Sequence, residues 1–410
     1  MSSLFKENRN FRYFLLNQTF AGIGSGMFAM FMMWVVHFQY NNTLYTGIAG
    51  FMLAAPRVAS FIVGPLVDRR SKVAIMRVTC LVQLVVVGLV LALPLVTGIG
   101  VWFIFPAILV FEIANTFSIP ARTAFLPRVV GSDELVKANA SIRILGTLGG
   151  LAIGAFLYFI LRGSGDFALV YAVNAAVLFL GFVFALLIRH HEISEKSTPE
   201  YEAGNYFAEL RNGFSYITKG LMAHLVMVFI LTAMVANAAL VNLPMFAEIH
   251  TGVASGYILL AFISLAGGVL GAYIAGAVSG KLELSKIFIM GFIAMGAVRI
   301  LFVHVIADDF RRALLILALY TGIAGAIGLL AHSLQQKILP KKILGRFFTI
   351  ETTLLGIAAA VGSLAGGVAG RVLPEVDMVF IIQGGVYIVI GLGLCFSRYI
   401  RALPKMEDVK

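Results

Sequence analysis

Charged residues are scarce in this sequence: Asp, Glu, Lys and Arg make up 12% of its 410 residues, whereas hydrophobic residues make up 60%. A soluble domain carries about 25% charged residues and about 45–50% apolar residues. Both departures go in the same direction, so the surplus apolar surface must face lipid. We therefore expect an integral membrane protein.

Cysteine is nearly absent, and so are the motifs of enzymes. Cys80 and Cys395 each fall inside an apolar run, which is typical of small hydrophobic side chains and not of a disulfide. The sequence lacks metal-ligand spacings, a Ser-His-Asp set, and the G-x-x-x-x-G-K-[ST] loop that binds ATP phosphates. It therefore predicts a protein that is not an enzyme, uses no cofactor or metal, and is not driven directly by ATP.

Long apolar runs are what the sequence has instead. A helix needs about 20 mainly apolar residues to cross a bilayer, and windows of that size predict an all-α membrane protein with twelve transmembrane helices. The predicted spans are 11–37, 46–67, 73–95, 101–121, 137–161, 167–189, 221–247, 255–279, 286–306, 312–336, 346–371 and 378–399.

The basic residues orient these spans. Most Lys and Arg residues fall in the N-terminus, the even-numbered connections and the C-terminus, whereas the odd-numbered connections hold only Arg162, Arg311, Arg312 and Arg371. Positive charge marks the cytoplasmic side, so both termini are predicted to be cytoplasmic. The net charge of +11 is thereby explained as a topology signal, without a nucleic-acid partner.

The longest polar connection divides the spans six and six. The predicted parts are an N-terminal half (1–189), a cytoplasmic linker (190–220) and a C-terminal half (221–410). Apolar residues at helical spacing in the linker are equally compatible with an amphipathic helix on the membrane surface and with a simple connection. A shift of 208 residues aligns the halves weakly and lays Arg143 over Glu351.

Several motifs resemble the major facilitator superfamily over essentially the whole chain. "GPLVDRRSK", from Gly64 to Lys72, looks like that family's signature between spans 2 and 3. "DELVKANA", "LPKKILGRFFTI" and "GSLAGGVAGRV" resemble the branch that holds macrolide-type drug efflux pumps, siderophore exporters similar to enterobactin exporters, and lysophospholipid transporters. The resemblance implies two pseudo-symmetric six-helix halves and transport by alternating access.

Two features depart from the drug pumps of that branch. Those pumps usually carry an Arg in the middle of span 4, where this sequence reads Phe111-Glu112, and "GTLGGLAIG" in span 5 lacks the proline of the antiporter motif. Both departures argue against a direct transfer of the drug-pump mechanism, but not against the fold.

Glu112 is the most informative intramembrane charge. Desolvation disfavours a charged carboxyl group, whereas a nearby arginine favours it, so a carboxyl group balanced between the two can load and release a proton. Intramembrane charges are costly and usually functional, which favours proton coupling or substrate contact over a static ion pair. The repeat register adds Glu351 as a second candidate for proton coupling.

Two arginines are candidates for pairing with these carboxylates. Arg57 follows Pro56, which loosens the helix locally, and its guanidinium can bind either Glu112 or an anionic substrate. Arg143 and Glu351 fall at equivalent depths, which is compatible with a salt bridge across the halves or with separate cavity roles. Arg299, on a peripheral helix by the resemblance, is expected to snorkel or to pack against polar groups of neighbouring helices.

The remaining site residues are predicted from their position. A gate on the inner side is expected where Asp68 can interact with the positive N-terminus of helix 11 near Arg346, with Gly64, Arg69 and Arg70 in the same motif. Polar residues on helices that line the cavity by the resemblance are candidates for substrate binding, although polar side chains also bridge packed helices. They are Asn17, Asn115, Asn237, Asn242 and Gln335, together with Arg57, Glu112 and Arg143.

These observations predict a proton-coupled antiporter that exports a small amphipathic molecule, such as a drug or a siderophore-like metabolite. A lipid or lysophospholipid flippase of the same fold is the alternative, and a channel or a non-transporting receptor is the alternative from another class. The expected partners are the substrate, protons and the lipid bilayer. We expect a monomer in a cell membrane, and specifically in a bacterial plasma membrane.

Overall fold

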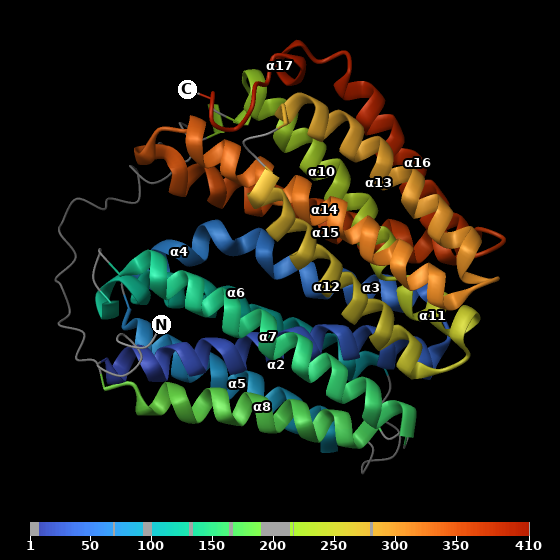
Figure 1. Ribbon diagram of the computed structural model, residues 1–410. Helices are drawn as coiled ribbons and strands as arrows, with labels where there is room; N and C mark the ends of the chain where they lie inside the picture. The colour runs from blue at the N-terminus through green and yellow to red at the C-terminus, as the bar shows by residue number, and fades with distance from the viewer. Residues whose placement is uncertain are drawn as a thin grey trace. The chain divides into compact units, whose positions relative to one another are not determined.

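The described residues fold almost entirely into helices (Figure 1). The computed structural model describes residues 8–68, 70–92, 101–130, 134–163, 167–189, 214–215, 217–278 and 282–409. In this part of the chain the only extended pairing outside helices is a single bridge between Glu283 and Lys405. The expectation of an all-helical protein is confirmed for these residues.

The helices group into two compact units. Unit 1 contains Met1–Tyr40 and Met52–Glu202, and unit 2 contains Asn41–Phe51 and Ala203–Lys410. The linker predicted at 190–220 falls largely outside the described residues, so its structure stays a prediction. The sequence alone did not anticipate that Asn41–Phe51 groups with unit 2.

Unit 1 is a bundle of apolar helices. It consists of α2 (Arg9–Tyr40), the end of α3 (Thr43–Ala54), the 3₁₀ helix η1 (Ala55–Ala59), α4 (Ser60–Asp68), α5 (Lys72–Ala92), α6 (Val101–Val130), α7 (Leu135–Gly163) and α8 (Phe167–Leu187). Helix α2 packs on α6, α7 and α8, and α5 packs on α6 and α8. The core at one end joins Phe14 and Phe125, whose rings lie 5.4 Å apart.

Unit 2 contains the remaining helices. They are α10 (Gly220–Leu240), α11 (Leu243–Thr251), α12 (Ala254–Val278), α13 (Leu284–Ile306), α14 (Phe310–Ile338), α15 (Lys341–Val372), α16 (Asp377–Leu394) and α17 (Arg398–Arg401). Helix α13 packs on α14 and α16, α12 on α14, and α10 on α15.

Small residues allow close approach within this unit. A side chain at Gly296 of α13 would collide with the backbone of Gly384 in α16. Bulkier residues would separate these backbones, so the glycines set the distance between the two helices.

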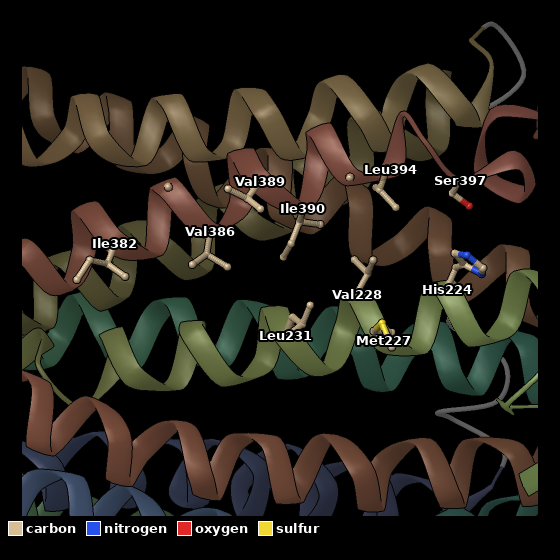
Figure 2. Close-up of a pocket in the computed structure, with 12 residues that line it drawn as sticks. His224, Met227, Val228, Leu231, Ile382, Val386, Val389, Ile390, Leu394 and Ser397 are labelled. Carbon is tan, nitrogen blue, oxygen red and sulfur yellow. The ribbon is translucent and has the colours of Figure 1, made fainter.

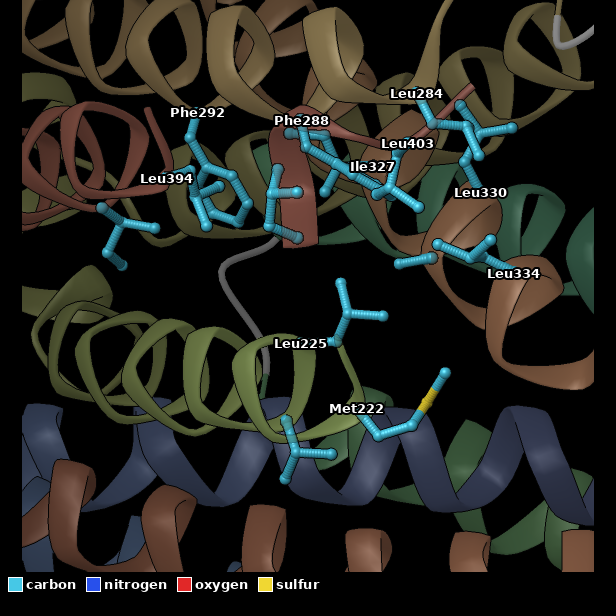
Figure 3. Close-up of a cluster of buried hydrophobic side chains, with 14 of the residues drawn as sticks. Met222, Leu225, Leu284, Phe288, Phe292, Ile327, Leu330, Leu334, Leu394 and Leu403 are labelled. Carbon is cyan, nitrogen blue, oxygen red and sulfur yellow. The ribbon is translucent and has the colours of Figure 1, made fainter. Parts of the chain in front are cut away.

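A cluster of buried hydrophobic side chains joins five parts of unit 2 (Figure 3). Leu225 comes from α10, Phe288 from α13, Leu334 from α14 and Leu394 from α16. Leu403, beyond α17, inserts into the same cluster. The residues after α16 therefore pack onto the bundle, where they contact the first part of α10.

Eleven helices in the described residues are long and apolar enough to cross a membrane. They match the predicted spans except the fifth, at 137–161, which coincides with α7. Helix α7 is long enough to cross a bilayer, and its fully described stretch Ile144–Phe159 is apolar. The chain is a multi-span membrane protein, while the count of twelve spans and the cytoplasmic termini stay predictions.

The predicted end of span 4 at residue 121 is wrong. Helix α6 continues to Val130 although it contains Pro106, Pro120 and Pro127. Proline is tolerated in membrane helices because neighbouring helices and local adjustments satisfy the freed carbonyl groups. Arg122, assigned to a loop from the sequence, therefore lies inside the helix.

Two predicted spans are interrupted in the middle. Span 2 changes to 3₁₀ geometry over η1, where Pro56 is one of the first residues, which confirms the local loosening expected there. Span 7 breaks at Val241 and Asn242, and α11 starts with Leu243 and Pro244. Breaks of this kind free backbone groups, which side chains must then satisfy.

Candidate functional site

Glu112 lies in the middle of α6 and is only 3% exposed. The preceding residue, Phe111, stacks on Phe28 of α2 with ring centroids 3.8 Å apart. Asn115, one turn further along α6, donates from Nδ2 to Glu112 Oε2 at 3.4 Å. The carboxyl group thus sits in an apolar interior with one weak hydrogen-bond donor.

Arg57 provides the cationic partner of Glu112. It belongs to η1, which packs on α6, and its guanidinium interacts electrostatically with the Glu112 carboxyl group. Arg57 is exposed although it lies inside the span Thr43–Gly64. Because a charge facing hydrocarbon is costly, we infer that Arg57 borders a hydrated space.

Glu112 and Arg57 together form a site that suits proton exchange. The buried carboxyl group lies within electrostatic reach of the exposed Arg57, for which we infer a hydrated surrounding. A change in hydration at Arg57 alters the electrostatic stabilisation of the Glu112 carboxylate, because the interaction weakens as the dielectric rises. The structure brings Glu112 within electrostatic reach of Arg57. An ion pair between them and a substrate at either residue stay predictions.

Glu351 forms a second buried polar pair, in unit 2. Its Oε1 accepts a hydrogen bond of 2.6 Å from Gln335 Nε2, and both residues are buried. The pair links α14 to α15 in an apolar setting that includes Phe347. Gln335 was predicted to bind substrate, and the structure gives it a partner in Glu351 instead of leaving its amide free.

Several predicted residues lie outside what the structure describes. Arg69 is not among the described residues, and the side chains of Asp68 and Arg143 are not described either. The gate at Asp68 and the pairing of Arg143 with Glu351 therefore stay predictions. Arg70 is exposed, and a side chain at Gly64 would meet open space.

The candidate asparagines have helix-packing partners. Asn17 of α2 is buried and donates to Gly181 O of α8 at 2.8 Å. Asn242 donates to Ala238 O of α10 and to Gly366 O of α15, both at 2.8 Å, and so joins the break between α10 and α11 to α15. Asn237 donates to Ala233 O within its own helix. These bonds account for the three residues structurally, and their predicted role in substrate binding is untested.

Arg122 is a buried charge that sequence reasoning missed. Its Nη2 lies 3.9 Å from Cys80 Sγ, and its Nε has no hydrogen-bond partner among the described residues. Asn17 Nδ2 also approaches Cys80 Sγ, at 3.5 Å. The signal in the sequence was the helical spacing of Ala121, Phe125 and Leu126 around Arg122, which continues the apolar face past Pro120.

Arg299 packs against polar and aromatic side chains of neighbouring helices and does not snorkel. Packing against polar groups was one of the two arrangements expected for it. Its Nε donates to Gln383 Oε1 at 2.9 Å. The guanidinium lies 4.7 Å from the ring centroids of both Tyr320 and Phe380. Gln383 in turn donates to Tyr387 Oη at 3.0 Å. This network joins α13, α14 and α16 and serves to pack unit 2.

A further pair lies at the end of α11. His250 Nε2 is 3.0 Å from Asp377 Oδ1 at the start of α16. The ring of His250 also contacts Phe246, with centroids 4.5 Å apart. The pair holds α11, the short helix after the break in span 7, against the start of α16. No feature of the sequence distinguishes His250 and Asp377 from other polar residues near helix ends.

The site offers no arrangement for a metal ion. Among the described residues, no group of three or more His, Cys, Asp or Glu side chains is placed to ligate one. The buried carboxyl group of Glu112 lies near Asn115 and Arg57, and that of Glu351 lies beside the Gln335 amide. The fold and these intramembrane groups define the class of multi-span transport proteins.

Comparisons with known proteins agree on that class. Residues 14–307 match the model of the Major Facilitator Superfamily. Since the match covers more than half of the sequence, the chain belongs to the Major Facilitator Superfamily. A comparison with curated proteins gave no significant match.

Solved structures share the fold at low sequence identity. The nucleoside transporter NupG is 14% identical with a TM-score of 0.70, over 93% of this chain and 98% of that one. A D-xylose-proton symporter is 14% identical with a TM-score of 0.72, over 96% and 97%. A bacterial homologue of the human lysosomal transporter Spinster is 12% identical with a TM-score of 0.69, over 97% of each chain. The chain therefore shares the fold of these transporters.

Proposed function

We propose that this chain is a proton-coupled secondary exporter of a small amphipathic molecule. The observation that carries the proposal is Glu112, a buried carboxyl group in the middle of α6 that interacts with the exposed Arg57. A group of this kind changes its proton occupancy when its surroundings change from dry to hydrated. The resemblance to efflux proteins supports the outward direction.

The mechanism uses alternating access. On the outer side, Glu112 binds a proton and becomes neutral, which removes its electrostatic interaction with Arg57. On the inner side, the proton leaves, and the carboxylate again interacts with Arg57 or with a positively charged substrate. The proton neutralises Glu112, whereas a positively charged substrate requires the charged carboxylate. The two are therefore bound in turn, and they are exchanged across the membrane.

Glu351 is the second group proposed for proton coupling. Its bond to Gln335 Nε2 stabilises the carboxylate, because an amide N–H can donate to it. The proposed gate comprises Gly64, Asp68, Arg69, Arg70 and Arg346, and the proposed location is a bacterial cell membrane.

The test is transport by the purified full chain in liposomes that contain a pH-sensitive dye. Three fluorescent probes are offered separately: a cationic amphiphile, an anionic amphiphile and a lysophospholipid. We expect one of the amphiphiles to accumulate against its gradient while protons move the opposite way. Liposomes without protein serve as the control.

Other results would decide against the proposal. Movement of a probe only down its gradient would indicate a channel. Movement of the lysophospholipid alone would favour the lipid transporter of the same fold. Accumulation with protons moving in the same direction would indicate a symporter.

A further inference from the structure

Two apolar stripes face each other on α10 and α16. On α10 the stripe runs from His224 through Val228 to Leu231, and on α16 it runs from Ile382 through Val389 to Leu394, with Ser397 just beyond the helix. The members recur at three- and four-residue spacing, which places each stripe on one face of its helix. Figure 2 shows these side chains pointing into the space between the two helices.

The stripes leave a groove instead of a packed contact. The groove has a volume of about 570 Å³, within the range of roughly 300–1,000 Å³ that is typical of sites for small molecules. Met227 and Val389 are 65% and 67% exposed, so the groove opens to one side. In a membrane-spanning bundle this open side faces lipid.

Glycine keeps the groove open. A side chain added at Gly385 or at Gly393 would meet no atom within 4 Å. By contrast, Gly384 and Gly391 on the same helix lie against the residues of α13. The helix thus uses one set of glycines for packing and another to widen the groove.

The length of the groove suits one acyl chain. From Ile382 to Leu394, the last residue of α16, the helix rises about 18 Å at roughly 1.5 Å per residue. One leaflet of the hydrocarbon core is about 15 Å thick, half of the roughly 30 Å of a bilayer. The groove is therefore about as long as one leaflet of the hydrocarbon core is thick.

One end of the groove is closed by aromatic rings. The His224 ring lies 5.2 Å from the Tyr399 ring, and His224 Nδ1 donates to Gly220 O at 2.9 Å. Arg398 stacks on Tyr399 at 5.0 Å and donates to its hydroxyl group. Because α17 contacts α10, the closed end has a fixed structure.

This same end is basic. Lys219 is the N-cap of α10, and Arg398 and Arg401 form the ends of α17. All three are exposed, and within the described chain none forms an ion pair with a carboxylate. The acidic residue Glu283 nearby on α13 is paired with Lys286 at 3.1 Å. The positive charge at the closed end is therefore available to an anion.

We propose that this groove is a binding site for an anionic phospholipid. One acyl chain lies along the stripes of α10 and α16, and the phosphate binds Lys219, Arg398 and Arg401. An apolar groove that ends in basic side chains complements a lipid with a negative headgroup, and such clusters near membrane helices favour anionic over neutral lipids. The site is separate from Glu112 and does not depend on the proposed export function.

The test uses the purified full chain in lipid nanodiscs with two photoreactive probes. Phosphatidylglycerol and phosphatidylcholine carry the same diazirine acyl chain, and labelled peptides are identified by mass spectrometry. We expect phosphatidylglycerol to label the groove residues of α10 and α16 several-fold more strongly than phosphatidylcholine does. Equal labelling by the two probes would overturn the proposal, because it would indicate ordinary bilayer lipid.

Two sets of variants examine the two parts of the site. In Lys219→Gln/Arg398→Gln/Arg401→Gln, the preference for phosphatidylglycerol should be lost, so that both probes label the groove about equally, since each basic residue attracts an anionic headgroup. In Gly385→Leu/Gly393→Leu, both probes should lose their labelling of the groove. An unchanged preference in the first variant would contradict the headgroup assignment, and unchanged labelling in the second would contradict the acyl-chain assignment.

Matched controls come from the same chain. Arg311→Gln/Arg371→Gln removes exposed charges from the opposite ends of helices in unit 2 and should leave the preference unchanged. Gly88→Leu adds a side chain at an exposed glycine of α5 with open space around it. Thermal unfolding confirms that each variant is folded. Cross-links between two protein copies through the groove would instead assign it to a dimer contact and overturn the proposal.

Discussion

Replacing Glu112 by glutamine removes the one carboxyl group on α6 and keeps the size of the side chain. Glutamine also keeps an oxygen atom that can accept the hydrogen bond from Asn115, so the helix packing should not change. If each transport cycle moves one proton through Glu112, a pH difference of one unit supplies about 1.4 kcal/mol. That free energy sustains about a tenfold concentration ratio of substrate.

The assay is the steady-state accumulation of the transported probe in liposomes with an imposed pH difference. We expect a ratio of about ten for the wild type and about one for Glu112→Gln, while exchange of labelled for unlabelled probe continues. A ratio of about one hundred in the wild type would indicate two protons per cycle, with Glu351 as the second carrier. Glu351→Gln should then lower the ratio to about ten.

Arg57 supplies a control for this reasoning. Because Arg57 acts on the carboxyl group of Glu112, adding Arg57→Gln to Glu112→Gln should cause no further loss of accumulation or exchange. A double variant that loses exchange as well would show that Arg57 has its own contact with the substrate. Wild-type accumulation in Glu112→Gln would refute the coupling role of Glu112 altogether.

Three further predictions concern the contacts that hold unit 2 together, and thermal unfolding in detergent measures each. Gln335→Leu removes the donor to Glu351 and should destabilise the protein by about 2 kcal/mol, as expected for a hydrogen bond to a charged group; an unchanged midpoint would mean that Glu351 finds another donor. Arg299→Met leaves Gln383 Oε1 without its donor and should lower the free energy of unfolding by about 1–3 kcal/mol, with Arg299→Lys intermediate and transport retained. If the Arg299→Met variant is as stable as the wild type, the desolvation of the charge offsets its contacts. Gly296→Ala forces α13 away from α16 and should lower the free energy of unfolding by about 1–3 kcal/mol through overpacking. Gly88→Ala, at a position with open space, is the control and should have no such effect. An unchanged stability of Gly296→Ala would mean that the two helices can separate freely.

The sequence by itself determined the class of the protein and most of its helices. A composition of 12% charged residues leaves too little polar surface to cover a soluble domain. Apolar runs of about 20 residues locate membrane helices because the bilayer has a fixed thickness. The same logic singled out Glu112, since a carboxylate in an apolar run is costly wherever the helix lies.

Only the tertiary structure decided which side chains meet. The predicted span 4 ended at residue 121, but neighbouring helices can satisfy the carbonyl groups that Pro120 and Pro127 free, so α6 continues to Val130. Gln335 and Glu351, 16 residues apart on two helices, pair because the turn between α14 and α15 brings them together. The groove between α10 and α16 likewise could not be predicted, because a stripe of apolar residues looks the same whether a helix or a lipid covers it. Periodicity along one helix fixes which face is apolar, whereas the partner of that face depends on how separate helices pack.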